Sequence, residues 1–243
     1  MATQSRLPAF LLTRPAAQSQ RFAGQLCQRF GVDLDITISP LLTPRFLDAL
    51  LPKGRYDALI FTSETGVAAF QALASRPNSL PKRAYCVGNR TAKAAVLAGL
   101  EPISADGDAT DLIALVRRDS PAALLHISGA QSRGAIGQTL TEAGIKTDVC
   151  VLYEQAEQPL THAAVTLMQG ESPVLAPLFS PRSAALFREQ ISKLGPIAPL
   201  TCAVLSQAVG AELPDLPGAK LFYADRPTAA ALIEAIAENC GVA

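Results

Sequence analysis

A small polar residue follows almost every predicted strand of this chain, at the point where a helix is expected to begin. These residues are Thr13 with Arg14, Thr62 with Ser63, Gly88 with Thr91, Ser128 with Gly129, and Ser180. Each hydroxyl can simply cap the following helix, which contributes about 1 kcal/mol. As a set, they would instead place free N–H groups and positive helix ends at one edge of a parallel sheet. Such an edge suits a ligand that carries several carboxylates.

Three larger side chains could act on such a ligand. Arg14 and Arg133 follow corresponding junctions, and a guanidinium can bind a carboxylate through two hydrogen bonds, although an exposed arginine is often only solvated. Tyr153 lies in the segment VLYEQ, and a protonated phenol can donate to a leaving oxygen. Packing of this tyrosine on a proline is the structural alternative. Adjacent strand residues point to opposite sides, so Tyr153 and Glu154 cannot both face the ligand.

Familiar catalytic machinery is absent from the sequence. It contains no G-x-x-x-x-G-K-[ST], G-x-G-x-x-G, G-x-S-x-G or H-E-x-x-H motif, which argues against a nucleotide-binding enzyme, a serine hydrolase or a zinc protease. The five cysteines include no C-x-x-C pair, and the only histidines, His126 and His162, are far apart. We therefore expect no metal, no cofactor and no disulfide framework, with His126 in a structural role.

The composition indicates a globular protein without a nucleic-acid partner. Of the 243 residues, 49% are hydrophobic and 17% charged, and 21 basic residues balance 21 acidic ones. A neutral chain lacks the broad basic surface that nucleic acids require. The apolar stretch near the N-terminus is too short for a signal peptide or a membrane span. We expect a cytoplasmic monomer without a membrane partner, because no long apolar seam suggests an obligate dimer.

The chain repeats itself at a nearly fixed offset. LLTRPAAQSQRFAGQL returns as LLHISGAQSRGAIGQTL, so that Leu11 and Leu124 are 113 residues apart. Phe61 and Phe179 are 118 residues apart, and Cys86 and Cys202 are 116 apart. These offsets predict two similar units of about 110 residues, each able to bury a core. Two such units would leave a crevice that faces the carboxyl ends of their strands, where ligands bind in this class of sheet.

Short apolar runs alternate with amphipathic stretches along the chain. The expected strands are 9–12, 58–61, 83–87, 123–127, 174–179, 201–205 and 221–224; the expected helices are 18–30, 65–74, 91–98, 111–117, 132–143, 182–193 and 228–238. This alternation predicts an α/β protein with parallel sheets covered on both faces. Two extended apolar segments, which start at Thr37 and Val151, break the alternation and are expected to be connectors. The repeat itself permits either a tandem of lobes or two connectors that cross one gap.

Six segments carry a resemblance to a known family. LLTRP, FTSETGV at 61–67, VGNRTA at 87–92, ISGAQSRG at 127–134, VLYE and FSPRSA at 179–184 resemble the uroporphyrinogen-III synthase family in the same order over almost the whole chain. The resemblance implies a cofactor-free enzyme of tetrapyrrole biosynthesis. Such an enzyme cyclises linear hydroxymethylbilane, a polycarboxylate, with inversion of its terminal pyrrole, ring D, and loss of water.

The resemblance also implies an architecture and residue roles. In this family a pair of connectors joins two flavodoxin-like lobes across a cleft, which favours the crossed arrangement. The predicted lobes are then 1–36 with 158–243, and 41–152, with hinge connectors at 37–40 and 153–157. The hinge tyrosine thought to assist hydroxyl departure matches Tyr153, the threonine of the glycine turn matches Thr91, and the serine before the second-lobe helix matches Ser180.

One departure from the family pattern concerns the glycine turn of the second lobe. Leu205 and Ser206 stand where Gly88 and Asn89 stand in the first lobe, so close approach of the backbone to a carboxylate is in question there. The Ser206 hydroxyl is the expected substitute. A two-lobed protein that binds an anionic metabolite without chemistry is the rival interpretation. A flavodoxin-like regulatory module ranks last, because Thr13 and Ser63 stand where it would have acidic phosphoacceptors.

Overall fold

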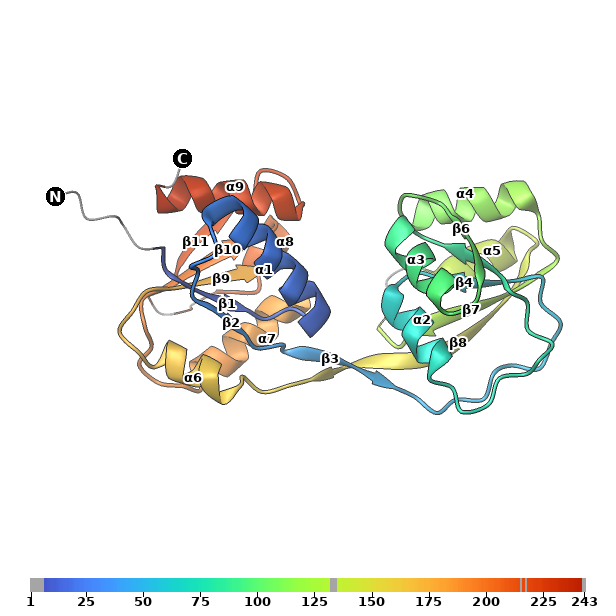
Figure 1. Ribbon diagram of the computed structural model, residues 1–243, viewed down its shortest axis with the longest axis horizontal. Helices are drawn as coiled ribbons and strands as arrows, with labels where there is room; N and C mark the ends of the chain where they lie inside the picture. The colour runs from blue at the N-terminus through green and yellow to red at the C-terminus, as the bar shows by residue number, and fades with distance from the viewer. Residues whose placement is uncertain (1–6, 132–134, 215, 217, 242–243) are drawn as a thin grey trace. The chain divides into compact units, whose positions relative to one another are not determined.

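The computed structural model describes residues 7–131, 135–214, 216 and 218–241, which divide into two compact α/β units (Figure 1). Unit 1 comprises the described residues up to Thr43 and from Glu157 onward, and unit 2 comprises Pro44–Ala156. Unit 1 is therefore built from two separate stretches of chain. None of the described helices is long and apolar enough to cross a membrane.

Unit 1 contains a five-stranded sheet in the order β11-β10-β9-β1-β2, in which every neighbouring pair is parallel. Its strands are β1 (Ala9–Leu12), β2 (Ile36–Ile38), β9 (Val174–Leu178), β10 (Leu200–Val204) and β11 (Lys220–Tyr223), and its helices are α1 (Ala16–Phe30), α6 (His162–Met168), α7 (Pro181–Ser192), α8 (Gln207–Gly210) and α9 (Ala229–Cys240). Phe10 packs with Phe22 of α1 and Ile236 of α9, whereas Leu11 packs with Phe187 of α7 on the other face. Both faces of this sheet are thus covered.

Unit 2 contains a six-stranded sheet in the order β3-β8-β7-β4-β5-β6, parallel from β8 to β6. Its strands are β3 (Leu42–Phe46), β4 (Ala58–Phe61), β5 (Arg83–Cys86), β6 (Glu101–Ser104), β7 (Ala123–Gly129) and β8 (Lys146–Glu157), and its helices are α2 (Glu64–Gln71), α3 (Asn89–Leu97), α4 (Ala109–Asp119) and α5 (Ile136–Glu142). Phe61 packs with Val67 of α2 on one face, and Ile60 packs with Val116 of α4 on the other.

The two sheets have the same spatial order once the repeat is taken into account. The sequence repeat pairs β1 with β7, β9 with β4 and β10 with β5. By extension, β11 corresponds to β6 and β2 corresponds to β8. When each strand of unit 1 is replaced by its counterpart in unit 2, the order β11-β10-β9-β1-β2 becomes β6-β5-β4-β7-β8. The sheets differ in the point at which the chain enters each one and in β3, which has no counterpart in the sheet of unit 1. The predicted duplication of two parallel-sheet lobes is confirmed.

The chain passes from one unit to the other within β3 and β8, which are neighbours in the sheet order. The predicted connector at 37–40 is misplaced, because Thr37 and Ile38 belong to β2 and pair with β1. Tyr153, predicted in the other connector, lies inside β8 and is paired with Gly129 of β7. The two cases share a physical cause: an extended apolar segment has the same sequence pattern whether it joins a sheet or links two lobes.

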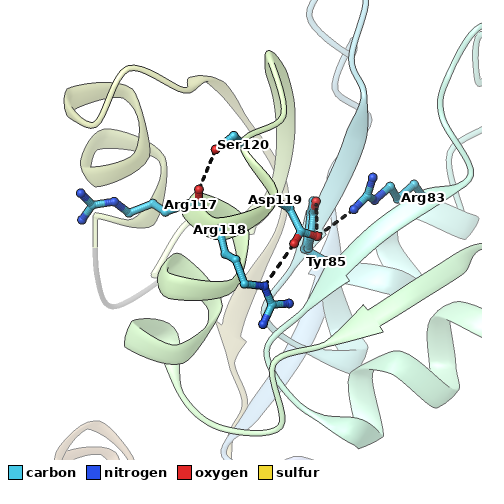
Figure 2. Close-up of polar contacts among 6 residues, drawn as sticks. All are labelled: Arg83, Tyr85, Arg117, Arg118, Asp119 and Ser120. Atoms are coloured by element: carbon cyan, nitrogen blue, oxygen red, sulfur yellow. Dashed lines mark hydrogen bonds and ion pairs between the residues drawn. The ribbon is translucent and has the colours of Figure 1, made fainter.

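A polar cluster anchors the end of α4 to the beginning of β5 (Figure 2). The buried Tyr85 hydroxyl donates to Asp119 Oδ2 at 3.1 Å, and Arg83 Nη2 lies 2.8 Å from the same oxygen. Arg118 Nε lies 3.4 Å from Oδ1. Burial, helped by the hydrogen bond to Asp119, raises the pKa of Tyr85 to about 12. This cluster lies at the amino end of β5, at the opposite edge of the sheet from the predicted site residues.

Candidate active site

The carboxyl ends of β4 and β7 form the switch point of the sheet in unit 2. These strands are neighbours, but β4 continues through α2 to β5 on one side, while β7 continues through α5 to β8 on the other. Loops that leave in opposite directions open a crevice above the strand ends, and ligands of open parallel sheets bind there. Ser63 follows β4, and Gly129 ends β7.

The Tyr153 side chain reaches this switch point from β8. Its hydroxyl lies 2.9 Å from Ser63 Oγ, and both residues are half-buried. The Tyr153 carbonyl accepts the N–H of Ala130 at 2.8 Å, which fixes the backbone beside β7. The next residue, Glu154, does not bind Ser63 but forms an ion pair with Arg45 of β3. Its Oε1 lies 2.8 Å from Arg45 Nε and 2.6 Å from Nη2. The phenol is thus held at the edge where the sequence predicts ligand binding.

Gly129 makes room for the Tyr153 ring. A Cβ at position 129 would lie 2.6 Å from Cζ and 2.7 Å from Cε2 of Tyr153, closer than nonbonded carbon atoms approach. The irregularity of the β7–β8 pairing lies between Ser128 and Gly129, next to the point where Gly129 pairs with Tyr153. Gly129 was predicted to contact substrate; in the described structure its evident function is to accommodate the aromatic ring.

Ser63 also begins helix α2. Its backbone is extended, and its Oγ accepts the N–H of Gly66 at 3.1 Å, which is a regular N-cap. Thr62, the other residue of this junction, is half-buried beside it. The predicted cap is therefore present at Ser63, but the same oxygen also contacts the phenol. The structural and functional interpretations of this hydroxyl are not exclusive.

Gly88 is the N-cap of α3 and lies in extended backbone with φ −150° and ψ 169°. Gly88 has no side chain with which to cap α3, so the first-turn N–H groups of this helix have no N-cap hydroxyl or carboxylate as their acceptor. Thr91 is the third residue of α3 and is only 5% exposed. Its hydroxyl is thus less accessible than its predicted place in an open turn suggested, because the helix already begins at Asn89.

Two further predictions for unit 2 need correction or fall outside the description. Ser128 was expected at a strand-to-helix junction, but it lies within β7, is 2% exposed, and donates to the Gly129 carbonyl at 3.3 Å. The helix described after β7 is Ile136–Glu142 with Ala135 as its N-cap, so it begins later than the start predicted at 132. Arg133 lies outside the described residues.

In unit 1 the equivalent switch point lies between β1 and β9. Thr13 follows β1 and is 1% exposed, and its Oγ1 has no hydrogen-bond partner among the described residues; the N-cap of α1 is Pro15. The Arg14 guanidinium stacks 4.0 Å above the centre of the Phe179 ring, across the switch point. Ser180 caps α7 by accepting the Ser183 N–H at 3.2 Å. Both predicted polar junctions of this unit are therefore at its carboxyl edge.

The predicted correspondence of Leu205 with Gly88 is shifted by one residue, because the N-cap of α8, which corresponds to Gly88 in α3, is Ser206. Ser206 has φ −164° and ψ 166°, so its backbone has the same extended conformation as Gly88. Its side chain makes no capping hydrogen bond within the described structure. Replacement of glycine therefore leaves the backbone path of this turn unchanged and adds a hydroxyl.

Burial keeps the reactive side chains of the two sheets neutral. It raises the pKa of Cys86, at the carboxyl end of β5, and of Cys202, in β10, to about 12. Burial also lowers the pKa of His126 in β7 to about 4, and neither ring nitrogen has a hydrogen-bond partner among the described residues. Thiols and an imidazole in these states are poor nucleophiles and poor acids at neutral pH. Within the described ranges, no three His, Cys, Asp or Glu side chains gather to hold a metal ion.

Comparison with known proteins identifies the family. A family model described as uroporphyrinogen-III synthase HemD matches residues 23–234. The chain belongs to the uroporphyrinogen-III synthase family. Members of this family cyclise hydroxymethylbilane in tetrapyrrole biosynthesis, and the chain is accordingly a cyclising lyase. A search of curated proteins finds no significant match.

A solved structure of this family shares the fold. Uroporphyrinogen-III synthetase from Helicobacter pylori superposes with a TM-score of 0.64 at 16% identity, over 94% of this chain and 97% of that one. A mutant uroporphyrinogen III synthase from Thermus thermophilus gives a TM-score of 0.48 at 14% identity, over 96% and 98%. At such identities the likeness concerns the fold, whereas the family match identifies the activity.

Sequence reasoning missed the contacts that hold the phenol in place. The sequence predicts Ser63 and Tyr153 as site residues, but it does not predict their hydrogen bond to each other. It also does not predict the contact of Arg45 with Glu154, the neighbour of Tyr153. The one available signal was Gly129, because a glycine that ends a strand often marks the close approach of another group. The partner of that approach depends on strand pairing and cannot be read from local sequence.

Proposed function

We propose that Tyr153 is the proton donor of the cyclisation of hydroxymethylbilane. The observation that carries this proposal is the placement of its hydroxyl, 2.9 Å from Ser63 Oγ, above the switch point of unit 2. Tyr153 is half-buried, so part of its side chain remains accessible from outside the protein. A general acid must be both accessible and oriented, and Tyr153 meets both conditions.

The reaction begins with proton transfer from Tyr153 to the hydroxyl of the terminal hydroxymethyl group. The carbon–oxygen bond then breaks, water leaves, and the electron-rich pyrrole stabilises the resulting azafulvene-like cation. Ring D attacks this carbon through its substituted α carbon, the one already joined to the bridge from the neighbouring pyrrole. That bridge bond then breaks and re-forms at the free α carbon of ring D, which inverts the ring. The proton lost from that free α carbon balances the one that Tyr153 donated, so one water molecule leaves overall.

The carboxyl edges of the two sheets supply groups that bind carboxylates. In unit 2 these are the N–H groups at the start of α3, next to Gly88 and Thr91, and the junction of Thr62 with Ser63. In unit 1 they are the Arg14 guanidinium and the hydroxyls of Thr13, Ser180 and Ser206. Substrate contacts of Ser128, Gly129 and Arg133 stay predictions from the sequence, because Ser128 is 2% exposed, Gly129 lies against the Tyr153 ring and Arg133 lies outside the described residues. Positive helix ends and neutral donors suit a polyacid in a chain without net charge.

Selectivity in this proposal comes from control of the substrate conformation. Free hydroxymethylbilane closes without inversion, so the enzyme must hold the chain where the inverted attack is reached first. Fixed contacts to several carboxylates restrict the approach of the two ends, and such positioning contributes several kcal/mol. Exclusion of water from the cation prevents its return to the alcohol.

A comparison of Tyr153→Phe with the unaltered protein tests the proton-donor role. Loss of one general acid is expected to lower kcat by about 10²- to 10⁴-fold. The KM and the unfolding midpoint in urea should change little, because the ring remains in place. The products, oxidised to porphyrins and separated by isomer, should shift from type III toward the type I isomer of spontaneous closure. An unchanged kcat would exclude Tyr153 as the acid.

We also propose that the protein is a cytoplasmic monomer. All five cysteines are free thiols, which supports a reducing compartment. Large exposed hydrophobic residues of the described chain, such as Val32, Leu50 and Leu97, lie in separate segments of the sequence. Light scattering after size exclusion and cell fractionation test these two statements, and a stable dimer or a membrane-associated pool would contradict them.

A further inference from the structure

A hydrogen-bond chain runs from the start of helix α2 to the Tyr153 hydroxyl. The Gly66 N–H donates to Ser63 Oγ at 3.1 Å, and Ser63 Oγ lies 2.9 Å from Tyr153 Oη. A serine hydroxyl has one proton and two lone pairs. Because Gly66 occupies one lone pair, Ser63 can still donate its own proton to the phenol oxygen.

From this arrangement we propose that Ser63 is a positioning residue that directs the Tyr153 proton toward substrate and stabilises the phenolate formed when that proton leaves. This inference rests on the proposed role of Tyr153. When Ser63 donates to Oη, the phenolic O–H has to point elsewhere, and the open side of the half-buried ring is the direction left to it. The hydrogen bond then strengthens as negative charge develops on the phenol oxygen, because bonds to ionised acceptors are shorter and stronger.

The N-terminus of helix α2 favours donation of the Ser63 proton to the Tyr153 oxygen. This N-terminus carries a partial positive charge, which the Gly66 N–H passes to Ser63 Oγ. A hydroxyl that accepts such a bond becomes a better donor, since consecutive hydrogen bonds polarise one another. The phenol therefore meets the positive end of a helix through one intervening hydroxyl.

The corresponding serine of unit 1 shows what the same fold does without a phenol. Ser180 caps α7 as Ser63 caps α2, but its Oγ lies 2.8 Å from Ser183 Oγ and is thus satisfied within its own helix. The position facing Tyr153 in β7 is a glycine, which allows the ring to reach Ser63. Capping is therefore common to both units, whereas contact with a phenol distinguishes unit 2.

Substitution of Ser63 by glycine separates the two functions of its hydroxyl. Glycine is a tolerated N-cap, so the helix loses little, but no donor to Tyr153 remains. We expect Ser63→Gly to lower kcat by about 10- to 100-fold with a small change in KM, in line with loss of one bond to a charged acceptor. Ser63→Thr keeps the hydroxyl and should restore most of the activity. Thr228→Gly removes a comparable cap from α9 and serves as the control, with kcat unchanged.

The double variant Ser63→Gly/Tyr153→Phe decides between a relay and a simple cap. If Ser63 acts through the phenol, its removal has no further effect on kcat once the phenolic oxygen is gone. Equal kcat losses in both backgrounds, or a wild-type kcat for Ser63→Gly, would overturn the proposal while leaving Tyr153 as the acid. An unchanged kcat for Tyr153→Phe alone would remove the acid and the relay together.

Discussion

Replacement of Gly129 by alanine tests whether the position of the phenol, rather than its presence, limits the reaction. The new Cβ would lie 2.6 Å from Cζ, 2.7 Å from Cε2 and 3.0 Å from Oη of Tyr153. Ordinary contacts between carbon atoms begin near 3.5 Å, so the ring must move by about 1 Å. The backbone of Tyr153 is held by the Ala130 N–H, so the movement falls on the side chain.

The displacement is expected to affect catalysis more than stability. A shift of about 1 Å away from Ser63 would lengthen the 2.9 Å contact beyond hydrogen-bond distance. Misplacement of a catalytic group by that amount lowers rates by about 100-fold. Overpacking costs about 1–3 kcal/mol, and the lower end applies because the far end of a half-buried ring can move. We therefore expect kcat to fall by about two orders of magnitude with a free energy of unfolding lowered by only about 1 kcal/mol.

Two comparisons make this prediction specific. Gly24→Ala, in α1, adds a methyl group with no atom within 4 Å and should leave kcat unchanged while slightly stabilising the helix. In a Tyr153→Ala background, which removes the ring, Gly129→Ala should have no further effect on kcat. Initial rates, porphyrin isomer ratios and urea unfolding measure these quantities. Full activity of Gly129→Ala, or an equal loss in both backgrounds, would refute the argument.

Two predictions concern residues remote from the reacting groups. Burial lowers the pKa of His126 from 6.5 to about 4, so the unfolded chain takes up a proton in this range that the native protein does not; stability should fall by up to about 3 kcal/mol as the pH drops from 6.5 to 4. His126→Leu should flatten that part of the pH dependence in urea unfolding, and an unchanged slope would contradict the assignment. Tyr85→Phe should lower the free energy of unfolding by about 0.5–1.5 kcal/mol, through loss of the bond to Asp119, without a change in kcat. Loss of activity at unchanged stability would instead show that this cluster affects the site.

The central strands were predicted well because their sequence signals are local. The runs at 9–12 and 58–61 form β1 and β4 with the expected bounds, and all their residues are buried. The edge strand β6 was not predicted, because Glu101 and Pro102 are residue types that are uncommon in strands and β6 is only half-buried. The short helices α6 and α8 were missed too, since seven and four residues are too few to show a helical period.

The candidate site was predicted in its parts but not in its contacts. Hydroxyls and glycines after strands are visible in sequence, and so is a rare tyrosine. Their grouping depends on the register of β7 with β8 and on its irregularity at Ser128 and Gly129. Thr13 and Thr91 were judged by their place in the chain, whereas their burial depends on the packing of α1 and α3. Strand register and packing depend on residues far apart in the chain, so local sequence patterns do not reveal them.

Both units have polar residues at the carboxyl ends of their strands, but they differ in the strand that carries the proposed acid. The strand beside β7 is β8, with 12 residues, and it brings Tyr153 to the switch point. Its counterpart beside β1 is β2, with three residues, and it is followed by Ser39, which is fully buried and accepts the Thr161 N–H at 2.9 Å. Loss of one water molecule requires one proton donor, whereas a polyacid is held best by many carboxylate-binding groups. In the proposed mechanism, duplication accounts for the many carboxylate-binding groups, and extension of a single strand accounts for the one acid.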